Sequence, residues 1–412
     1  MTSKTFISVE EARTEILEQI EPVSAERAFL KDCIDRRIAE EVRAPTDVPA
    51  FDNSSRDGYA FRWRDVQSGD RRLDVVATSA AGDPTDVEIG EGEAARIMTG
   101  AKLPRGADSV VMQEHVESED DSIVLDPEAD VDEGSWVRRA GRYLSEGEAV
   151  LEPGDEITPA GIGLLASFGR SRVNAYRRPR VGIVSTGDEL VDIDDTPGDG
   201  QIINSNSHLL ESLVRSYGAD PIVFPVARDS ESQVRDVYRQ AIDAADFVVS
   251  SGGVSVGDHD VVREVVDDLT GGMQFWKIRM KPGKPLAFGT ALGESNTPLL
   301  GLPGNPNSCF VCFHQFVRPV LRVAQGEPTR AQTPTRFEAV LEDDVSSTPH
   351  RRQYLAGRIT SGEGQPRFEA FQNQASANTA LFVGADAFGL VPEGTDHLSS
   401  GSTITVEPIE SA

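Results

Sequence analysis

The chain of 412 residues has few cysteines, few lysines and few aromatic residues. Its three cysteines, Cys33, Cys309 and Cys312, are too few for a disulfide framework. Cys309 and Cys312 spell C-x-x-C, but a zinc site would need a second pair of ligands, which the sequence does not offer. Both lie in an apolar helical pattern, so we expect buried core cysteines rather than a redox motif.

Long hydrophobic runs are also absent from the sequence. No apolar stretch comes near the roughly 18 residues that a membrane span needs. The first six residues lack the apolar segment of a signal peptide. We therefore expect a soluble, cytoplasmic protein without a membrane partner.

Positive charge is scarce as well. The chain has 40 Lys and Arg against 68 Asp and Glu, a formal net charge of −28, and only six of the basic residues are lysines. Such a charge repels nucleic acid, so we expect no nucleic-acid partner. In roughly 1 M salt the Debye length falls to about 3 Å and this self-repulsion is screened. The acidic, lysine-poor composition therefore indicates a salt-loving (halophilic) host.

The residue patterns change several times along the chain. Apolar periodicity predicts a helix over 8–20 and a second helical stretch over 24–41. Short β-like runs between Gly, Pro and Asp turns fill residues 46–144. From residue 179, strands and helices alternate, which predicts a mainly parallel sheet with both faces covered. Residues 330–412 are β-like again.

The predicted fold class is multidomain α/β plus β, with a central three-layer α/β domain. At this length a chain splits into several domains. We expect an N-terminal helix packing on the α/β domain (1–24), a linking mixed domain (25–45 with 145–178), a β-rich inserted domain (46–144), the α/β domain (179–326) and a C-terminal β-barrel-like domain (327–412).

A glycine-rich turn at residues 250–260 lies between a buried-strand pattern and a helix pattern. Its glycines let the backbone approach a ligand closely, and free N–H groups at the start of a helix favour an anion. Asp258 and Asp260 follow, where a hard metal could be held against the same anion.

The same turn offers an alternative reading. Residues 253–257 spell G-x-S-x-G, the pattern of a hydrolase nucleophile elbow, with Ser255 as the nucleophile. The turn is longer than such an elbow, and the downstream candidates His314, His350 and His397 lie in no recognisable loop motif. We therefore favour anion binding over a serine hydrolase.

Four polar loops follow strands of the predicted sheet, at residues 185–189, 228–229, 250–260 and 301–306. Ligands bind beyond the carboxyl ends of the strands in open parallel sheets, so we expect these loops to share one site. Their carboxylates could hold Mg²⁺ with substrate phosphates completing its shell. These carboxylates are Asp188, Glu189, Asp229, Asp258 and Asp260.

Half of the lysines lie in one stretch, residues 277–285. A solvated surface run is the usual reason for clustered charge. Since the chain avoids lysine elsewhere, we favour binding of phosphate or a similar oxyanion by this segment.

Two loops of the predicted inserted domain, residues 51–60 and 98–101, are dense in polar groups. The first is consistent with an Asx-type turn that caps a strand and equally with a loop that delivers Asp57 to a site. Both interpretations stay open at this point.

Six motifs, taken in order, resemble those of the molybdopterin molybdenumtransferases, the MoeA family, which includes the E domain of gephyrin. The match runs along nearly the whole chain. The motifs are F-D-N-S and D-G-Y-A (51–54 and 57–60), R-I-M-T-G-A (96–101), S-T-G-D-E-L (185–190), S-G-G-V-S-V-G (251–257), M-K-P-G-K-P (280–285) and G-L-P-G-N-P (301–306).

This resemblance implies insertion of molybdate into adenylylated molybdopterin, with Mg²⁺-dependent release of AMP. It implies a homodimer whose active site lies where the α/β domain of one subunit meets the β-rich domain of the other. A molybdopterin adenylyltransferase is a further partner to consider.

The resemblance also implies roles for individual residues. For catalysis they are Asp57, Thr99, Asp188, Glu189, Asp229 and Asp260. For the metal they are Asp188, Glu189, Asp258 and Asp260. For the pterin cofactor they are Ser251, Gly252, Gly253, Ser255, Gly257, Lys277, Lys281, Lys284, Pro303, Asn305 and Pro306.

The chain departs from the family pattern at two places. Where the family commonly has Gly-x-Asp, this chain has Gly141-Arg142-Tyr143, and Arg56 replaces a usual apolar residue before Asp57. A tungstate-preferring paralogue is an alternative, because the two oxyanions have nearly the same size and charge. A non-catalytic molybdopterin-binding or scaffold protein is another, although the intact carboxylates Asp57, Asp188 and Asp260 argue against it.

Overall fold

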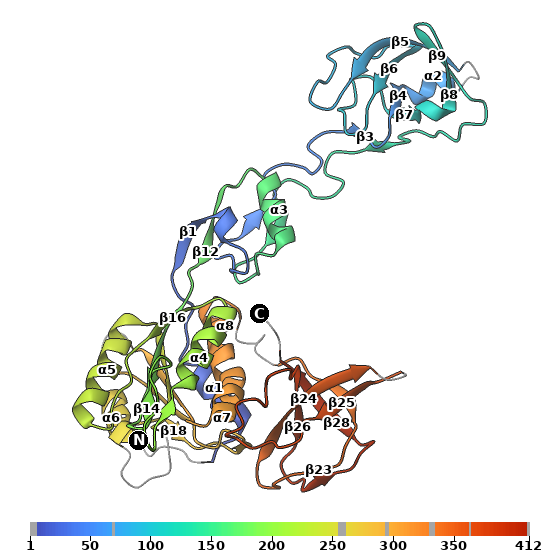
Figure 1. The fold of residues 1–412 in the computed structure, drawn as a ribbon. Helices are drawn as coiled ribbons and strands as arrows, with labels where there is room; N and C mark the ends of the chain where they lie inside the picture. Colours follow the sequence, from blue (N-terminus) through green and yellow to red (C-terminus); the bar gives the residue numbers. More distant parts are fainter. Residues whose placement is uncertain are drawn as a thin grey trace. The chain divides into compact units, whose positions relative to one another are not determined.

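The computed structural model in Figure 1 describes residues 6–67, 71–253, 261–292, 296–328, 334–361 and 364–409. Internal contacts divide the chain into two compact units. The first consists of Met1–Ala39, Pro153–Ala166 and Arg170–Ala412, and the second of Glu40–Glu152 and Ser167–Gly169. None of the helices in these described ranges has the length and apolar character to cross a bilayer.

A six-stranded sheet forms the centre of the first unit, in the order β16-β13-β17-β21-β20-β18. The first four strands are parallel, β20 runs antiparallel to β21, and β18 runs antiparallel to β20. The chain leaves β13 for β16 on one side and then crosses to β17 on the other, so the strand order reverses beside β13. The strands are β13 (Arg180–Ser185), β16 (Asp220–Val223), β17 (Phe247–Ser251), β18 (Phe275–Trp276), β20 (Ala287–Thr290) and β21 (Pro298–Leu302).

Helices cover both faces of this sheet and give the three predicted layers (Figure 1). Side chains alternate between the faces of a strand. Ile183 accordingly packs with α1, α4, α7 and α8, whereas Val184 packs with α5 and α6. The helices are α1 (Val9–Leu17), α4 (Ser205–Ser216), α5 (Glu231–Ala244), α6 (Val261–Thr270), α7 (Pro306–Cys312) and α8 (Arg318–Ala324).

The segment with the apolar helical pattern around Cys309 and Cys312 is not one regular helix. A π-helical segment, Phe313–Val317, joins α7 to α8. Cys309 and Cys312 lie in α7 with no exposed surface. Burial raises the pKa of Cys309 to about 12, so the reactive thiolate does not form near neutral pH. The prediction of buried core cysteines is confirmed.

The helical stretch predicted over 24–41 is wrong. Residues Ala25–Phe29 form strand β1, which pairs antiparallel with β12 (Arg172–Tyr176), and a short 3₁₀ turn follows at Leu30–Asp32. The pairing partner lies far along the chain, so a local periodicity of apolar residues cannot reveal the strand. Helix α3 (Pro159–Ser167) lies between the two segments in sequence.

The second unit contains another six-stranded sheet, in the order β7-β4-β6-β5-β9-β8. Its core includes Phe61, Leu73 and Val111. Two short ribbons, β3 with β10 and β2 with β11, accompany it. The elements are β2 (Val42–Arg43), β3 (Asn53–Ser54), β4 (Gly58–Phe61), α2 (Trp63–Val66), β5 (Arg72–Ser79), β6 (Glu93–Ile97), β7 (Ser109–Met112), a 3₁₀ turn (Gln113–His115), β8 (Val116–Glu119), β9 (Ser122–Leu125), β10 (Val137–Arg138) and β11 (Ala149–Leu151).

The C-terminal region of the first unit is a closed β-barrel, which confirms the predicted barrel-like domain. Its strands follow the order β24-β25-β22-β28-β26, and β26 pairs back with β24. Strand β19 (Met280–Lys281) of the α/β domain pairs with the start of β24. The strands are β22 (Phe337–Leu341), β24 (Arg352–Ser361), β25 (Pro366–Ala370), β26 (Ala387–Val391) and β28 (Thr403–Pro408), with a small ribbon of β23 (Val345–Ser346) and β27 (His397–Leu398).

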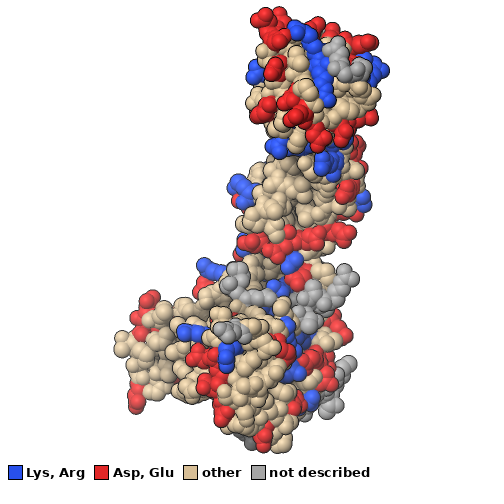
Figure 2. Space-filling view, turned by 90° about the vertical axis from the view of Figure 1, so that its right-hand side faces the viewer, with Lys and Arg blue, Asp and Glu red and all other residues tan. Residues whose placement is uncertain are grey.

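The two stretches of the predicted linking domain are divided between the two units, and the boundaries given for that domain stay a prediction. Acidic residues are spread over the face of the molecule seen in Figure 2, with basic residues among them. This distribution is consistent with the formal net charge of −28.

Candidate functional site

Three parallel strands end at the same level of the central sheet. Ser185 of β13 lies beside Ser251 of β17, and Ser251 lies beside Leu302 of β21. Beyond β13, Thr186 bridges to Ala227, which follows β16. The four polar loops that the sequence places after these strands therefore start side by side, next to the point where the strand order reverses.

A cleft of about 880 Å³ opens above these strand ends. Its charged lining residues within the described ranges are Glu189 and Asp229, so it is acidic. Asp188 lies next to it, and its Oδ1 accepts a hydrogen bond from Asp229 N (3.2 Å). The predicted residues that line the cleft are Glu189, Asp229, Ser251, Gly252, Gly253, Pro303, Asn305 and Pro306.

Gly252 holds two of these loops together. Its φ is +92°, and a Cβ at this position would lie 2.7 Å from the carbonyl oxygen of Thr186. Its N–H donates to the carbonyl of Leu302 (3.2 Å). Only glycine allows both the backbone conformation and this close approach, which explains the glycine in terms of loop packing as well as access for a ligand.

Asn206 is a site residue that the sequence patterns above do not single out. Its Nδ2 donates to Ser251 Oγ (2.7 Å) and to the carbonyl oxygen of Gly304 (2.7 Å), and so joins two loops of the cleft. The run Asn-Ser-Asn-Ser at residues 204–207 was the available signal, since such residues favour caps over helix interiors.

Two buried polar atoms at the cleft have no hydrogen-bond partner within the described part of the chain. They are Asn206 Oδ1 and Thr186 Oγ1, and both residues line the cleft. A buried polar atom without a partner costs about 1–3 kcal/mol. Such atoms beside a cleft indicate a polar ligand that supplies the missing hydrogen bonds.

Three helices begin at the cleft. Ser205 of α4, Val261 of α6 and Pro306 of α7 all line it. The free N–H groups and the positive dipole end of a helix start favour an anion. The cleft therefore combines acidic side chains with helix ends that attract phosphate.

A second cavity, of about 660 Å³, adjoins the cleft and shares Pro285, Asn305 and Ser308 with it. We call it the basic cavity. It lies between residues 281–285 and the barrel, and its cationic lining residues are Lys281, Lys284 and Arg351. Two carboxylates, Asp343 and Asp344, also line it, and one oxygen of Asp344 accepts a hydrogen bond from Ser400 N (2.8 Å).

Tyr354 also lines the basic cavity, and its hydroxyl oxygen is buried. Burial raises the pKa of Tyr354 to about 12, so its hydroxyl stays protonated near neutral pH. The charged groups that act on this hydroxyl are Glu407, Arg352 and Arg13.

The three lysines of the predicted anion-binding segment lie in different surroundings. Lys281 Nζ donates to Thr348 Oγ1 (3.3 Å), and Lys284 Nζ lies 5.2 Å from the ring centre of Phe6. Lys277 Nζ lies 4.1 Å from the ring centre of Trp276, and Lys277 is not among the residues that line either the cleft or the basic cavity.

In the second unit, Asp57 and Thr99 form a pair. Thr99 donates to Asp57 Oδ1 from its backbone N (2.7 Å) and from Oγ1 (2.8 Å). These two hydrogen bonds hold the pKa of Asp57 below its ordinary value, and Arg96 adds to the effect. Both residues are exposed, so the result is an oriented, ionised carboxylate at the surface.

Thr99→Val is expected to raise the pKa of Asp57 part of the way toward its ordinary value. The variant loses the hydroxyl bond but keeps the backbone bond, and both favour the charged form. Carboxyl carbon chemical shifts from NMR, titrated with acid, measure the change, and Asp57→Asn assigns the signal. Thr85→Val is the matched control, because the Thr85 hydroxyl instead accepts from Val87 N (3.2 Å). An unchanged Asp57 titration in Thr99→Val would contradict this account.

The two departures from the family pattern lie on the surface of the second unit. The Arg56 guanidinium lies 4.9 Å from the ring centre of Trp136, so the replacement makes a cation–π contact next to Asp57. Tyr143 is 61% exposed. Its backbone N–H donates to the Val48 carbonyl (2.9 Å). The contacts of the Tyr143 ring give no account of why a carboxylate is absent there.

Four predicted site residues lie outside the described residues: Ser255, Gly257, Asp258 and Asp260. The described ranges contain no group of three or more His, Cys, Asp or Glu side chains placed to hold a metal ion. The carboxylate oxygens of Asp188, Glu189 and Asp229 suit a hard cation in their chemistry. The metal site therefore stays a prediction.

The histidines named for the hydrolase alternative lie away from the lining of the cleft. His314 is buried in the π-helical segment, where burial lowers its pKa to about 3. His397 Nε2 lies 3.3 Å from Ser399 Oγ, in the region of the barrel. None of the three, His314, His350 and His397, lines the cleft above the strand ends.

Comparison with known proteins gives a consistent result along the chain. Three family models match: the MoeA N-terminal region, domains I and II (residues 7–169), a probable molybdopterin binding domain (182–323) and the MoeA C-terminal region, domain IV (338–409). A molybdopterin molybdenumtransferase of Haemophilus influenzae is 36% identical over 405 residues, covering 98% of each chain. One from Nostoc is 36% identical over 378 residues, covering 90% of this chain and 86% of that one. The crystal structure of a MoeA protein from Pyrococcus horikoshii matches with a TM-score of 0.84 and 29% identity, over 98% of this chain and 100% of that one.

Proposed function

The chain belongs to the molybdopterin molybdenumtransferase family, and from this premise we propose that it inserts molybdate into adenylylated molybdopterin and releases AMP. As a member of this family it is a transferase that acts in molybdenum cofactor biosynthesis. The observation that carries the finer proposal is the junction of the acidic cleft with the basic cavity.

The cleft at the strand ends is the proposed pterin site. The unpartnered atoms Thr186 Oγ1 and Asn206 Oδ1 are a hydrogen-bond donor and an acceptor of the kind that a pterin ring can satisfy. The helix starts and the glycine turn, with Ser255 and Gly257 in its undescribed part, would face the phosphates. Pro303, Asn305 and Pro306 shape the other wall of the cleft.

The basic cavity is the proposed site for the oxyanion. Lys281, Lys284 and Arg351 give it three positive charges against the two carboxylates Asp343 and Asp344. Molybdate is a dianion, and charge-assisted hydrogen bonds from lysine and arginine are the strong kind. Since the cavity shares part of its wall with the cleft, an oxyanion held there would lie beside the pterin.

Mg²⁺ fits the acidic side of this arrangement. A phosphate in a cleft lined by Glu189 and Asp229 is repelled unless a cation lies between them. Asp188, Glu189 and Asp229, with Asp258 and Asp260, would hold Mg²⁺. When bound, the ion would neutralise phosphate charge as the bond to AMP breaks. The protein side chains themselves bind and orient the substrate.

Asp57 and Thr99 are proposed to complete the site from a second copy of the chain in a homodimer. The fixed, ionised carboxylate of Asp57 is suited to orient an attacking group. A molybdopterin adenylyltransferase as supplier of the substrate remains part of the proposal.

The acidic composition also supports adaptation to high salt, and higher stability in molar salt than in low salt would be the matching result.

Incubation with adenylylated molybdopterin, Mg²⁺ and either molybdate or tungstate tests the proposal. We expect AMP release together with retention of the metal by the pterin, and no AMP release when Mg²⁺ is chelated. The ratio of rates with the two oxyanions distinguishes a molybdate enzyme from a tungstate-preferring paralogue. Tight pterin binding without AMP release would instead support the scaffold alternative.

A further inference from the structure

The N-terminal residues 6–10, which we call the strap, lie against the lysine segment of the basic cavity. Phe6 N donates to the carbonyl of Lys277 (2.9 Å), and Arg279 N donates to the carbonyl of Ile7 (2.9 Å). Ile7 and Ile278 thereby form a parallel bridge. The strap acts as an added strand for the backbone that continues into Lys281 and Lys284.

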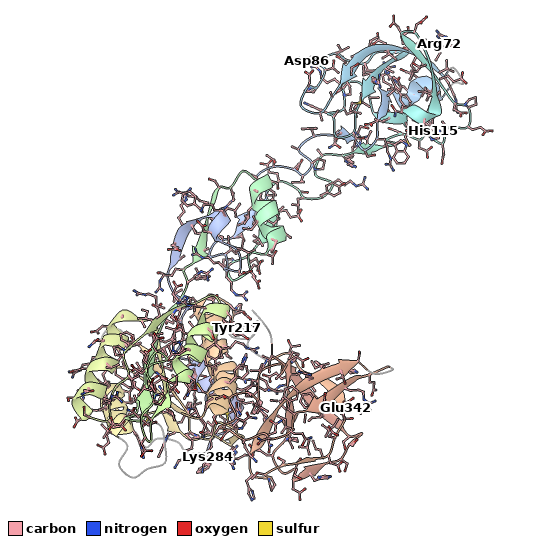
Figure 3. All side chains as sticks on the ribbon, viewed as in Figure 1. Arg72, Asp86, His115, Tyr217, Lys284 and Glu342 are labelled. Atoms are coloured by element: carbon pink, nitrogen blue, oxygen red, sulfur yellow. The ribbon has the colours of Figure 1, made fainter. Side chains whose placement is uncertain are left out.

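A side-chain contact of the strap reaches one of the cavity lysines directly. Lys284 Nζ lies 5.2 Å from the centre of the Phe6 ring, within the range of a cation–π interaction. Lys284 is labelled in Figure 3, below the central sheet and next to the barrel. The Arg279 guanidinium also donates to the carbonyl of Phe6. Phe6 is 44% exposed, so core packing alone does not explain its position.

The other end of the strap is tied to the strand that follows Arg351. Glu10 pairs with the guanidinium of Arg352. Burial alone would raise the pKa of Glu10, but the hydrogen bond from Arg352, a backbone hydrogen bond and the charges of Arg352 and Arg13 together hold this pKa below the ordinary value. Arg352 N in turn donates to the carbonyl of Arg279 (3.2 Å). The strap therefore contacts both chain segments that supply cations to the basic cavity.

We propose that the strap is a positioning element that sets the affinity of the basic cavity for its oxyanion. This inference rests on the proposed function of the cavity. Lysine side chains lose rotamer freedom when they bind an anion, and holding them in place beforehand reduces that cost. Phe6 restricts Lys284, and the backbone bonds of Phe6 and Ile7 fix the segment that precedes Lys281. The strap itself does not touch the substrate in this account.

Phe6→Ala and Phe6→Tyr test the proposal in the full-length protein. Phe6→Ala is expected to weaken molybdate binding two- to fivefold in titration calorimetry, the range of an exposed cation–π contact. The KM for molybdate should rise by about the same factor, whereas kcat at saturating molybdate should not change. Phe6→Tyr keeps an aromatic ring and should bind molybdate as the wild type does.

Two results would overturn the positioning role. One is wild-type molybdate affinity in Phe6→Ala. The other is an equal loss in Phe6→Ala and Phe6→Tyr, which would show that the ring has no specific role. Lys281→Ala in the same titration separates this inference from its premise. If that variant loses affinity and Phe6→Ala does not, only the strap is wrong. If Lys281→Ala also binds molybdate normally, the assignment of the basic cavity fails and the strap proposal fails with it.

Discussion

Lys281→Ala is expected to lower kcat/KM for molybdate about 30-fold, because a hydrogen bond to a charged group contributes about 2 kcal/mol. Lys281 is half-buried at the wall of the basic cavity. Among the described residues its ammonium group donates to Thr348 Oγ1 at 3.3 Å, and an ammonium has three donors, which leaves donors for an anion. The loss should appear mainly in the KM for molybdate, and circular dichroism should show a folded protein.

Two other lysines make this result specific. Lys31→Ala removes an equally scarce charge from an exposed side chain that pairs with Asp32, and its kinetics should match the wild type. Lys277→Ala decides the role of the third lysine of the segment, which lies against Trp276. A large loss in Lys277→Ala together with wild-type kinetics in Lys281→Ala would contradict the placement of the oxyanion in the basic cavity.

The meeting of the polar loops at one edge of the sheet could be predicted from the sequence, because it follows from local patterns. The strand–helix alternation after residue 179 implied a parallel sheet, and a parallel sheet collects the loops after its strands at one edge. Ser185, Ser251 and Leu302 do lie side by side. No detail of side-chain packing was needed for this step, since hydrophobic periodicity and glycine turns specify it.

Features that depend on pairing between strands far apart in the sequence could not be predicted from local patterns. The apolar pattern predicts a helix where strand β1 lies, because the partner β12 that makes it a strand is far along the chain. Closure of the barrel depends on β24 pairing with β26 as well as β25, which alternation along single strands does not specify. The basic cavity likewise depends on contacts between segments that are far apart in the sequence. Arg351 and Tyr354 reach it from the barrel, whereas Lys281 and Lys284 reach it from the α/β domain.

The polar loop before Gly58 contains a local turn, whereas the delivery of Asp57 to a site stays a proposal. Arg56 N donates to Ser54 Oγ (3.2 Å), which is a local turn of the expected kind. The same loop places Asp57 against Thr99, which lies 42 positions away in sequence. The turn residues could be read from the sequence, but the partner of Asp57 depended on how β4 pairs with β6.

A buried polar network connects α1, the π-helical segment and the barrel. Arg13 donates to Gln315 Oε1 (2.7 Å), and Gln315 Nε2 donates to Glu407 Oε1 (2.6 Å). Arg336 Nε donates to the other oxygen of Glu407 (3.2 Å). Gln315 and Glu407 are at most 1% exposed. Removing one partner from a buried charged network leaves the others unpaired, which costs more than the loss of a surface pair.

Glu407→Gln is therefore expected to destabilise the protein by about 3 kcal/mol, although the substitution hardly changes the volume of the side chain. Glu342→Gln is the matched control in the same barrel, and Glu342 is labelled in Figure 3. Glu342 pairs with Arg367, which is 45% exposed. The loss of this ion pair should therefore cost less than about 1 kcal/mol. Urea unfolding followed by circular dichroism measures both. Equal losses would show that the network acts as an ordinary surface pair. A much larger loss for Glu407→Gln would show that burial of Glu407 makes its charge necessary for joining the barrel to the α/β domain.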